Sequence, residues 1–221
     1  MSDKNDESIE SLSDMPVLEE HVVEESPDTM GGVLVSKEEV AQMASKVMVL
    51  ENLIKLSVKN IHFTVFMREI LLLLMRVIKS EGGAVLEVDE KKNRIFFRAA
   101  AGYTSDKVSK FVIQMGQGVV GHVIESKQPF VVNSVQDCEI HLKSITQMVG
   151  FEARNMIAVP IMIRGKAFAV VELLNRVGEE SYSNEDLEFV QYFCEMLSSV
   201  VEMRLVVSWA NNKTNSGEEA A

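Results

Sequence analysis

Cysteine and histidine supply the side chains that most often carry nucleophilic or metal chemistry, and this chain contains few of either. Its 221 residues include two cysteines, Cys138 and Cys194, and four histidines. The cysteines lie in different predicted elements, and no CxxC pair or Cys/His spacing typical of a zinc site occurs. The nucleophile elbow Gly-x-Ser-x-Gly, the HExxH pattern and the phosphate-binding loop are also absent from the sequence. The sequence therefore predicts neither catalytic residues nor a bound metal, and its cysteine usage is typical of a reducing compartment.

The charge distribution argues against nucleic acid as a direct partner. The chain carries a formal net charge of -11. Most of this excess lies in residues 1–30, where many carboxylates face only one basic residue, Lys4. The rest of the chain is nearly neutral, and it has no basic stripe of the kind that binds a phosphate backbone.

The apolar segments predict a cytoplasmic protein without membrane contact. The opening sequence MSDKNDESIE has neither the positive region nor the apolar region of a secretory signal. The longest apolar run, residues 70–75, lies between Glu69 and Arg76. It is far shorter than the roughly 20 residues that span a bilayer, so it is interpreted as part of a buried helix.

Residues 1–35 are predicted to form a disordered acidic tail, because they offer too little apolar surface to order themselves. Such a tail serves as an interaction or autoinhibitory arm, or simply as a solubilising leader. A helix is predicted for residues 36–60, where Ser36 and Glu39 have the spacing of a capping box. Its apolar residues follow the 3.5-residue period of a coiled coil, which favours a dimer seam, but packing along the next helix is an open alternative. These residues are Val40, Met43, Val47, Leu50 and Ile54.

Two further helices are predicted on either side of a set of strands. Residues 63–80 are apolar on more than one face and end before Gly82-Gly83, as a core helix does. Residues 183–209 begin with a cap formed by Ser183, Glu185 and Asp186, and residues 210–221 are expected to be a disordered tail. The apolar residues of this last helix also recur at steps of three and four: Leu187, Val190, Cys194, Leu197, Val201 and Leu205.

The stretch between these helices has the period-two pattern and Val/Ile content of strands. Because most of these strands are joined by hairpins, they predict a largely antiparallel sheet and an α+β fold with helices packed on the sheet. The predicted strands are residues 84–88, 94–101, 130–132, 155–163 and 167–175.

Three phrases then occur in a characteristic order: GQGVVGHVIESKQPFVVNSV, GFEARNMIAVPIMIRGKAFAVVELLNR and SYSNEDLEFVQYF. Together with the leading helix they resemble a GAF domain over residues 47–207, and the GAF unit with its last helix is assigned to residues 61–209. The resemblance implies a six-stranded antiparallel sheet with a pocket under a mobile helix and loop, here residues 137–148. The glycines of the first phrase, Gly116, Gly118 and Gly121, permit tight turns beside the sheet.

Among GAF domains, those of cyclic-nucleotide phosphodiesterases and adenylyl cyclases resemble this sequence most. Their signature is Asn-Lys, then Phe, three residues, then Asp-Glu. The matching positions are Asn175, Arg176, Tyr182, Asp186 and Leu187, so that Lys and Phe are replaced by similar residues and the final Glu is lost. This departure weakens the case for a cyclic nucleotide, and Asn175 with Asp186 can instead tie the last strand to the last helix.

The resemblance also places candidate ligand contacts on or beside the pocket-forming elements. A purine ring needs an apolar or stacking wall and a few fixed polar groups. Each candidate has a structural explanation as well, as a turn, cap, core or paired residue, and about half are expected to touch a ligand. The candidates are Asn133, Ser134, Asp137, His141, Ile145, Met148, Phe151, Asn155, Ala158 and Glu172.

Catalytic and redox alternatives rest on single residues. The enzyme on this fold, free methionine sulfoxide reductase, uses several clustered cysteines, whereas this chain has only Cys138 near the expected pocket. Related domains can hold haem, and His141 is the candidate axial ligand, with no second motif beside it. No basic residue adjoins Cys138 in the sequence, as the site of a reactive thiol would require.

The sequence therefore predicts a non-catalytic, stand-alone GAF domain that binds a small ligand, with a cyclic nucleotide as the named candidate. It is expected to form a homodimer through its terminal helices and to signal to a separate protein. The alternatives are a ligand-free interaction scaffold, whose pocket is filled by Met148, Phe151 and Met156, and a redox or haem sensor.

Overall fold

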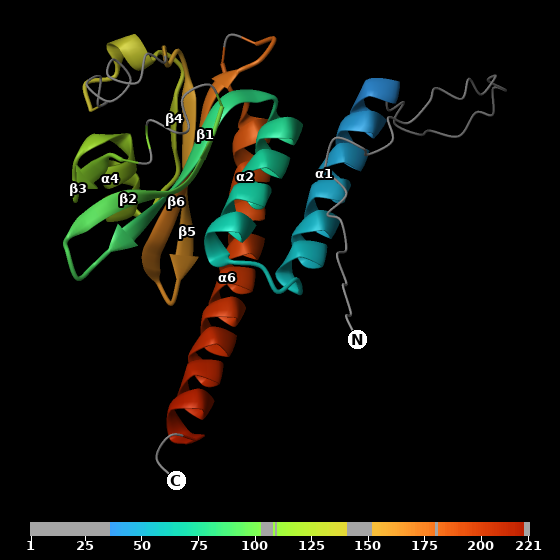
Figure 1. The fold of residues 1–221 in the computed structure, drawn as a ribbon. Coiled ribbons are helices and arrows are strands. Elements are labelled where there is room, and N and C mark those ends of the chain that lie inside the picture. Colours follow the sequence, from blue (N-terminus) through green and yellow to red (C-terminus); the bar gives the residue numbers. More distant parts are fainter. Residues whose placement is uncertain (1–35, 103–107, 109, 141–151, 180, 219–221) are drawn as a thin grey trace, which may run out of the picture. The chain divides into compact units, whose positions relative to one another are not determined.

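The computed structural model describes residues 36–102, 108, 110–140, 152–179 and 181–218, with side chains described as far as residue 208 (Figure 1). The predicted acidic tail, residues 1–35, and most of the predicted lid, residues 141–148, therefore lie outside the described residues.

A six-stranded sheet forms the centre of the domain, and every neighbouring pair of strands is antiparallel. The spatial order is β3-β2-β1-β6-β5-β4, so the two longest strands, β1 and β6, lie side by side in the middle. This arrangement confirms the predicted α+β class and the six-stranded antiparallel sheet. The strands are β1 (Ser80–Asp89), β2 (Arg94–Ala101), β3 (Val112–Gln114), β4 (Phe130–Val132), β5 (Met156–Ile163) and β6 (Lys166–Arg176).

Local sequence sets the two hairpins. The β5–β6 turn contains Arg164 and Gly165 at φ values of 50° and 76°. Positive φ at both central residues is typical of the tight turn whose twist matches that of an antiparallel pair. β1 and β2 meet through the polar residues 90–93, and their register places Leu86 opposite Phe97 and Glu87 opposite Phe96.

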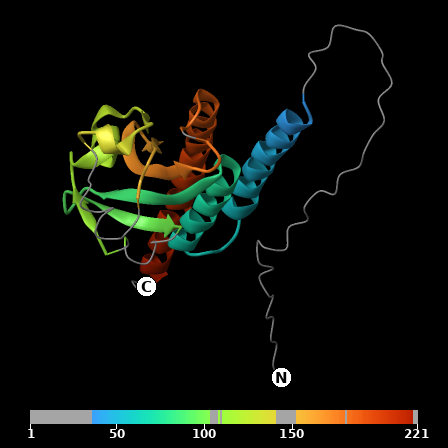
Figure 2. The same cartoon turned by 90° about the horizontal axis from the view of Figure 1, so that it is seen from above.

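Helices cover the two faces of the sheet unequally (Figures 1 and 2). The long helices α2 (Phe63–Ile78) and α6 (Asn184–Glu218) pack on one face, which we call the helix face. Phe66 of α2 and Phe193 of α6 are fully buried there. The short helix α4 (Gly118–Ser126) and the 3₁₀ turn η2 (Val135–Asp137) lie over the other face, which we call the α4 face.

The first helix, α1 (Lys37–Ser57), begins with the predicted capping box. The Glu39 backbone N–H donates to Ser36 Oγ at 3.1 Å, and the Ser36 N–H donates to Glu39 Oε2 at 2.7 Å. Val49 and Leu53 bury one side of α1 against the domain. The predicted seam lies on a different side, where Val40, Met43 and Val47 are all more than half exposed. α1 therefore has two apolar sides. One side packs against the domain, and the other faces outward.

The last helix differs from its sequence description in two ways. It continues to Glu218 instead of ending near residue 209, so that its end takes in most of the segment expected to be a disordered tail. Its apolar repeat is also largely satisfied within the chain, because Val190, Cys194, Leu197 and Val201 are buried and α6 packs on β5. Only Leu205, at the end of that repeat, is exposed.

The sequence patterns predict neither of two short elements, β3 and α4. β3 has only three residues, so period-two alternation cannot establish it. α4 begins at Gly118 and contains Gly121, and glycine normally weakens a helix prediction. A Cβ on Gly121 would lie 2.6 Å from the Gly116 carbonyl carbon, so glycine is required here for close packing of the turn.

None of the helices in the described ranges combines the length and apolar character needed to cross a bilayer.

Candidate functional site

The α4 face carries an apolar cluster that is built from several elements. Leu86 from β1, Met156 from β5 and Val170 from β6 pack together with Val123 of α4. Val135 of η2 and Val132 of β4 complete the cluster near the edge of the sheet. This face is the one on which the candidate ligand residues of β5 and β6 lie.

Glu172 is the polar exception within this face. It lies on β6 directly opposite Ala84 of β1 and Ala158 of β5, both of which are buried. No hydrogen bond or ion pair joins its carboxyl group to another of the described residues, and burial raises its pKa from 4.5 to about 7. A half-buried carboxyl group between two alanines is poorly compensated within the fold, and it is able to exchange a proton near neutral pH.

Three predicted contacts lie together at the exposed end of β4. Ser134 Oγ donates a 2.6 Å hydrogen bond to Asp137 Oδ2, and Asn133 precedes them. All three side chains are exposed. The helix predicted for residues 137–148 does not begin at Asp137, which instead ends η2 and is followed by non-helical residues 138–140.

The remaining candidates divide between the fold and the undescribed segment. Asn155 is buried, and its Oδ1 accepts a 2.8 Å hydrogen bond from the Arg176 backbone N–H, so part of its hydrogen-bonding capacity serves the fold. Ala158 lies beside Glu172 on the sheet, as described above. Four candidates lie outside the described residues: His141, Ile145, Met148 and Phe151.

The signature residues after β6 form a buried link between the sheet and α6. Arg176 Nε donates to Asp186 Oδ2 at 3.0 Å, and both side chains are largely buried. Asp186 Oδ2 also accepts from the Ser183 N–H at 3.1 Å, while Ser183 Oγ accepts from the Asp186 N–H. Burial raises the pKa of Tyr182, whose hydroxyl donates to Ser80 Oγ at 3.2 Å. The predicted tie between the last strand and the last helix therefore exists, with Arg176 rather than Asn175 as the partner of Asp186.

Asn175 serves a different connection. Its side chain donates to Glu81 Oε2 at 2.9 Å and to the Glu152 carbonyl at 2.8 Å, and its Oδ1 accepts from the Arg154 N–H at 2.8 Å. The guanidinium of Arg154 hydrogen-bonds Glu81 and lowers the pKa of that carboxyl group. Asn175 has a positive φ of 58°, a conformation that asparagine tolerates better than most residues. The signature asparagine thus fastens the segment that follows residues 141–151 to the ends of β1 and β6.

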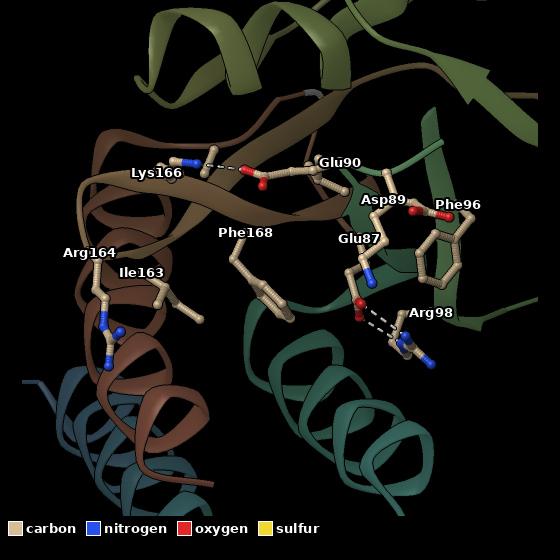
Figure 3. A pocket seen from close by; sticks show the side chains of 12 residues that line it. Glu87, Asp89, Glu90, Phe96, Arg98, Ile163, Arg164, Lys166 and Phe168 are labelled. Carbon is tan, nitrogen blue, oxygen red and sulfur yellow. Dashed lines mark hydrogen bonds and ion pairs between the residues drawn. The ribbon is translucent and has the colours of Figure 1, made fainter. Parts of the chain in front are cut away.

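A groove that the sequence did not indicate lies at the hairpin ends (Figure 3). It has a volume of about 720 Å³, and Phe96 and Phe168 form part of its wall. Figure 3 shows Arg98 beside Phe96, and its guanidinium lies 4.8 Å from the centre of that ring. Phe96 and Phe168 are far apart in sequence, and they line one groove because β1 and β6 pair in the centre of the sheet.

Most of the charged side chains around this groove form ion pairs within the protein. Glu87 accepts two hydrogen bonds from Arg98, at 2.6 Å and 2.9 Å, and Glu90 pairs with Lys166 at 3.0 Å. Arg164 pairs with Glu202 of α6 at 2.8 Å. Because the carboxylates of the groove are paired whereas Glu172 has no partner among the described residues, we take the region around Glu172 as the candidate site.

Groups that could hold a metal or act as a thiol are few in the described part of this region. Within the described part of the chain, no group of three or more His, Cys, Asp or Glu side chains is placed to hold a metal ion. Cys138 is half-buried beside η2, whereas Cys194 is buried in α6, where burial raises the pKa of its thiol.

The family follows from comparison with known proteins. The profile of the GAF domain family matches residues 62–202. The chain therefore belongs to the GAF domain family, a class of sensory and regulatory domains in signal transduction. Such domains are generally regulatory rather than catalytic, although some members of the fold are enzymes.

The chain is also similar, at lower identity, to part of a cyclic-nucleotide phosphodiesterase. It is 23% identical over 110 residues to the rod cGMP-specific 3',5'-cyclic phosphodiesterase subunit alpha of Mus musculus. The match covers 50% of this chain but only 13% of the phosphodiesterase, so most of that protein has no counterpart here.

Solved structures share the fold at low sequence identity. The GAF domain of a phosphoenolpyruvate-protein phosphotransferase from Coxiella burnetii superposes with a TM-score of 0.65 at 14% identity, covering 75% of this chain and 97% of that one. Free methionine-R-sulfoxide reductase from Neisseria meningitidis gives a TM-score of 0.62 at 13% identity, covering 77% and 94%. These likenesses confirm the fold and assign no ligand.

Proposed function

We propose that this chain is a non-catalytic, ligand-responsive regulatory domain that binds a small molecule on the α4 face, with Glu172 as the central polar contact. The observation that carries the proposal is the half-buried carboxyl group between Ala84 and Ala158, which has no hydrogen-bond or ion-pair partner among the described residues. A carboxyl group in an apolar setting costs stability unless something compensates it. A ligand with hydrogen-bond donors would supply that compensation.

A cyclic nucleotide is our first candidate ligand, and cGMP is the first probe. The support is the name of the rod cGMP-specific relative and the partial match of the signature at Asn175, Arg176, Tyr182 and Asp186. The edge of guanine presents neighbouring N–H donors, which complement the two acceptor oxygens of an ionised carboxylate. Adenine presents one donor beside one acceptor, which complements the protonated form.

Thermal unfolding with added cGMP or cAMP tests this proposal. At a hundredfold excess over Kd, a bound nucleotide should raise the Tm by about 5 °C or more. Because guanine favours the ionised form of Glu172, cGMP should bind more tightly as the pH rises from 6 to 8. Glu172→Gln should weaken binding and remove this pH dependence, whereas Glu87→Gln, a strand glutamate of the helix face, should leave both unchanged.

Failure of every tested nucleotide to stabilise the wild-type protein would overturn the cyclic-nucleotide proposal. If native mass spectrometry of protein purified from its own host then showed no bound small molecule, the ligand-free scaffold would replace the sensory reading.

We also propose that the output is a change in how the helices of two copies pair, read by a separate signalling protein. The support is the exposed apolar stripe of α1, in which Val40, Met43 and Val47 are 55%, 66% and 63% exposed. Such a stripe is costly in water and is typical of a helix that pairs with another. Sedimentation equilibrium of Val47→Glu should show a monomer where the wild type is a dimer, and Glu51→Gln on the same helix is the control. A monomeric wild type would contradict the proposal.

A further inference from the structure

Arg204 of α6 makes an unusual set of contacts with the connection between α1 and α2. Its Nη1 donates to the carbonyl oxygens of Ser57 and Lys59 at 3.0 Å and 3.1 Å. Its Nη2 donates to the carbonyl oxygen of Ile61 at 2.8 Å. The guanidinium also lies over the ring of Phe66, 4.7 Å from its centre. One side chain therefore binds three backbone groups that are distant from it in sequence.

The acceptors explain why an arginine is suited to this position. The last carbonyl groups of a helix have no partner within the helix and carry its partial negative charge. Ser57 is the last residue of α1, and Lys59 and Ile61 belong to the linker that turns the chain into α2. A planar guanidinium offers several donors in a fixed geometry, whereas the ammonium of lysine is a single point charge.

The contact lies where α6 leaves the sheet. Val201, one turn earlier, is buried, and Val207, one turn later, is 53% exposed. α1 is also attached to the domain through Val49 and Leu53, which are buried, and through Lys46, whose ammonium lies 5.4 Å from the ring centre of Phe189. Arg204 is therefore the point at which the outgoing helix holds the end of the incoming helix.

We propose that Arg204 is a latch that fixes the direction of α1 to the position of α6. A shift of α6 must either carry the 57–61 linker with it or break the three hydrogen bonds. The two helices that enter and leave the domain consequently move as one unit while the latch is closed, and the C-terminal end of α1 with its linker is released when it opens. This coupling requires no ligand, so it goes beyond the function proposed above.

Hydrogen–deuterium exchange of the full chain without ligand tests the latch. The Lys59 N–H donates to the Leu56 carbonyl, and the Ile61 N–H donates to that of Lys59, so their exchange reports the closed linker. In Arg204→Gln, exchange of these amides and of α1 should accelerate about tenfold or more, which corresponds to a loss of ~1.4 kcal/mol. Exchange within β1 and β6 should change less than about twofold. The control is Arg164→Gln, which breaks an exposed ion pair between the β5–β6 turn and Glu202 of α6. It should alter neither region.

Two results would overturn the proposal. One is unchanged protection of the linker and α1 in Arg204→Gln, and the other is equal acceleration in the sheet, which would make Arg204 a general stabilising residue. If Arg204→Gln does not fold, Arg204→Lys is tested instead. It keeps the positive charge but loses the planar set of donors. The same local acceleration, at a smaller factor, is then expected, and uniform protection equal to that of the wild type would contradict the latch.

Discussion

The two faces of the sheet use adjacent residues of the same strand for opposite purposes. On β6, Val171 points to the helix face and is 2% exposed, while Glu172 points to the α4 face beside two alanines. The helix face is closed by two long helices that bury large side chains such as Phe66 and Phe193. The α4 face is covered by shorter elements. The helix face thus buries large apolar side chains, whereas the α4 face combines an apolar cluster with one half-buried carboxyl group.

The sharpest test of this division is removal of a large side chain from the helix face. Phe193→Ala should lower the free energy of unfolding by about 3–5 kcal/mol, because it removes a fully buried ring of α6. Its neighbour Tyr192 is 53% exposed, so Tyr192→Ala should cost less than about 1 kcal/mol. Urea denaturation measures both variants. A small effect of Phe193→Ala would show that the helix face is not the stabilising side.

A matched pair of alanines compares how tightly the two faces are packed. Ala169 and Ala158 are both 0% exposed, but Ala169 faces the long helices and Ala158 faces the shorter elements. Ala169→Leu should destabilise the protein by about 2 kcal/mol through overpacking. Ala158→Leu should cost less than about 1 kcal/mol, because shorter elements yield more easily, and it should abolish ligand binding. Equal costs would remove the distinction between the faces.

The effect of a substitution at Glu172 on stability depends on pH. Burial raises the pKa of this carboxyl group from 4.5 to about 7 in the folded protein. The folded state therefore binds the proton more tightly than the unfolded state does, so that stability falls as the pH rises from about 4.5 to 7. Glu172→Gln should be more stable than the wild type by up to about 3 kcal/mol at pH 8, with little difference at pH 4. Thermal unfolding at several pH values measures this difference, and a wild type that gains stability over this range relative to the variant would contradict it.

The signature residues show how far a motif can be interpreted without coordinates. The sequence placed Asn175 and Asp186 in one structural tie, but each belongs to a separate connection in the fold. Arg176 and Asp186 join β6 to α6, whereas Asn175 holds Glu81 and the backbone at Glu152 and Arg154. Spacing along the chain identified the residues, and only the packing of β1 against β6 determined their partners.

The sequence alone determined the features that depend on neighbours within a few residues. These are the capping box of Ser36 and Glu39, the hairpin that joins residues 155–163 to residues 167–175, and the two-residue and 3.5-residue periods of strands and helices. The same local information missed the short β3 and α4 and ended α6 too early.

The tertiary structure decided which apolar stripes are covered and which polar groups are left uncompensated. The apolar stripes of α1 and α6 follow similar periods. β5 covers most of the α6 stripe, whereas Val40, Met43 and Val47 of α1 remain exposed. Likewise, the environment of Glu172 comes from alanines on two other strands, and the contacts of Arg204 come from a linker far away in the sequence. A periodic pattern specifies that a helix has an apolar side but not what covers it, because the covering surface comes from distant parts of the chain or from another molecule.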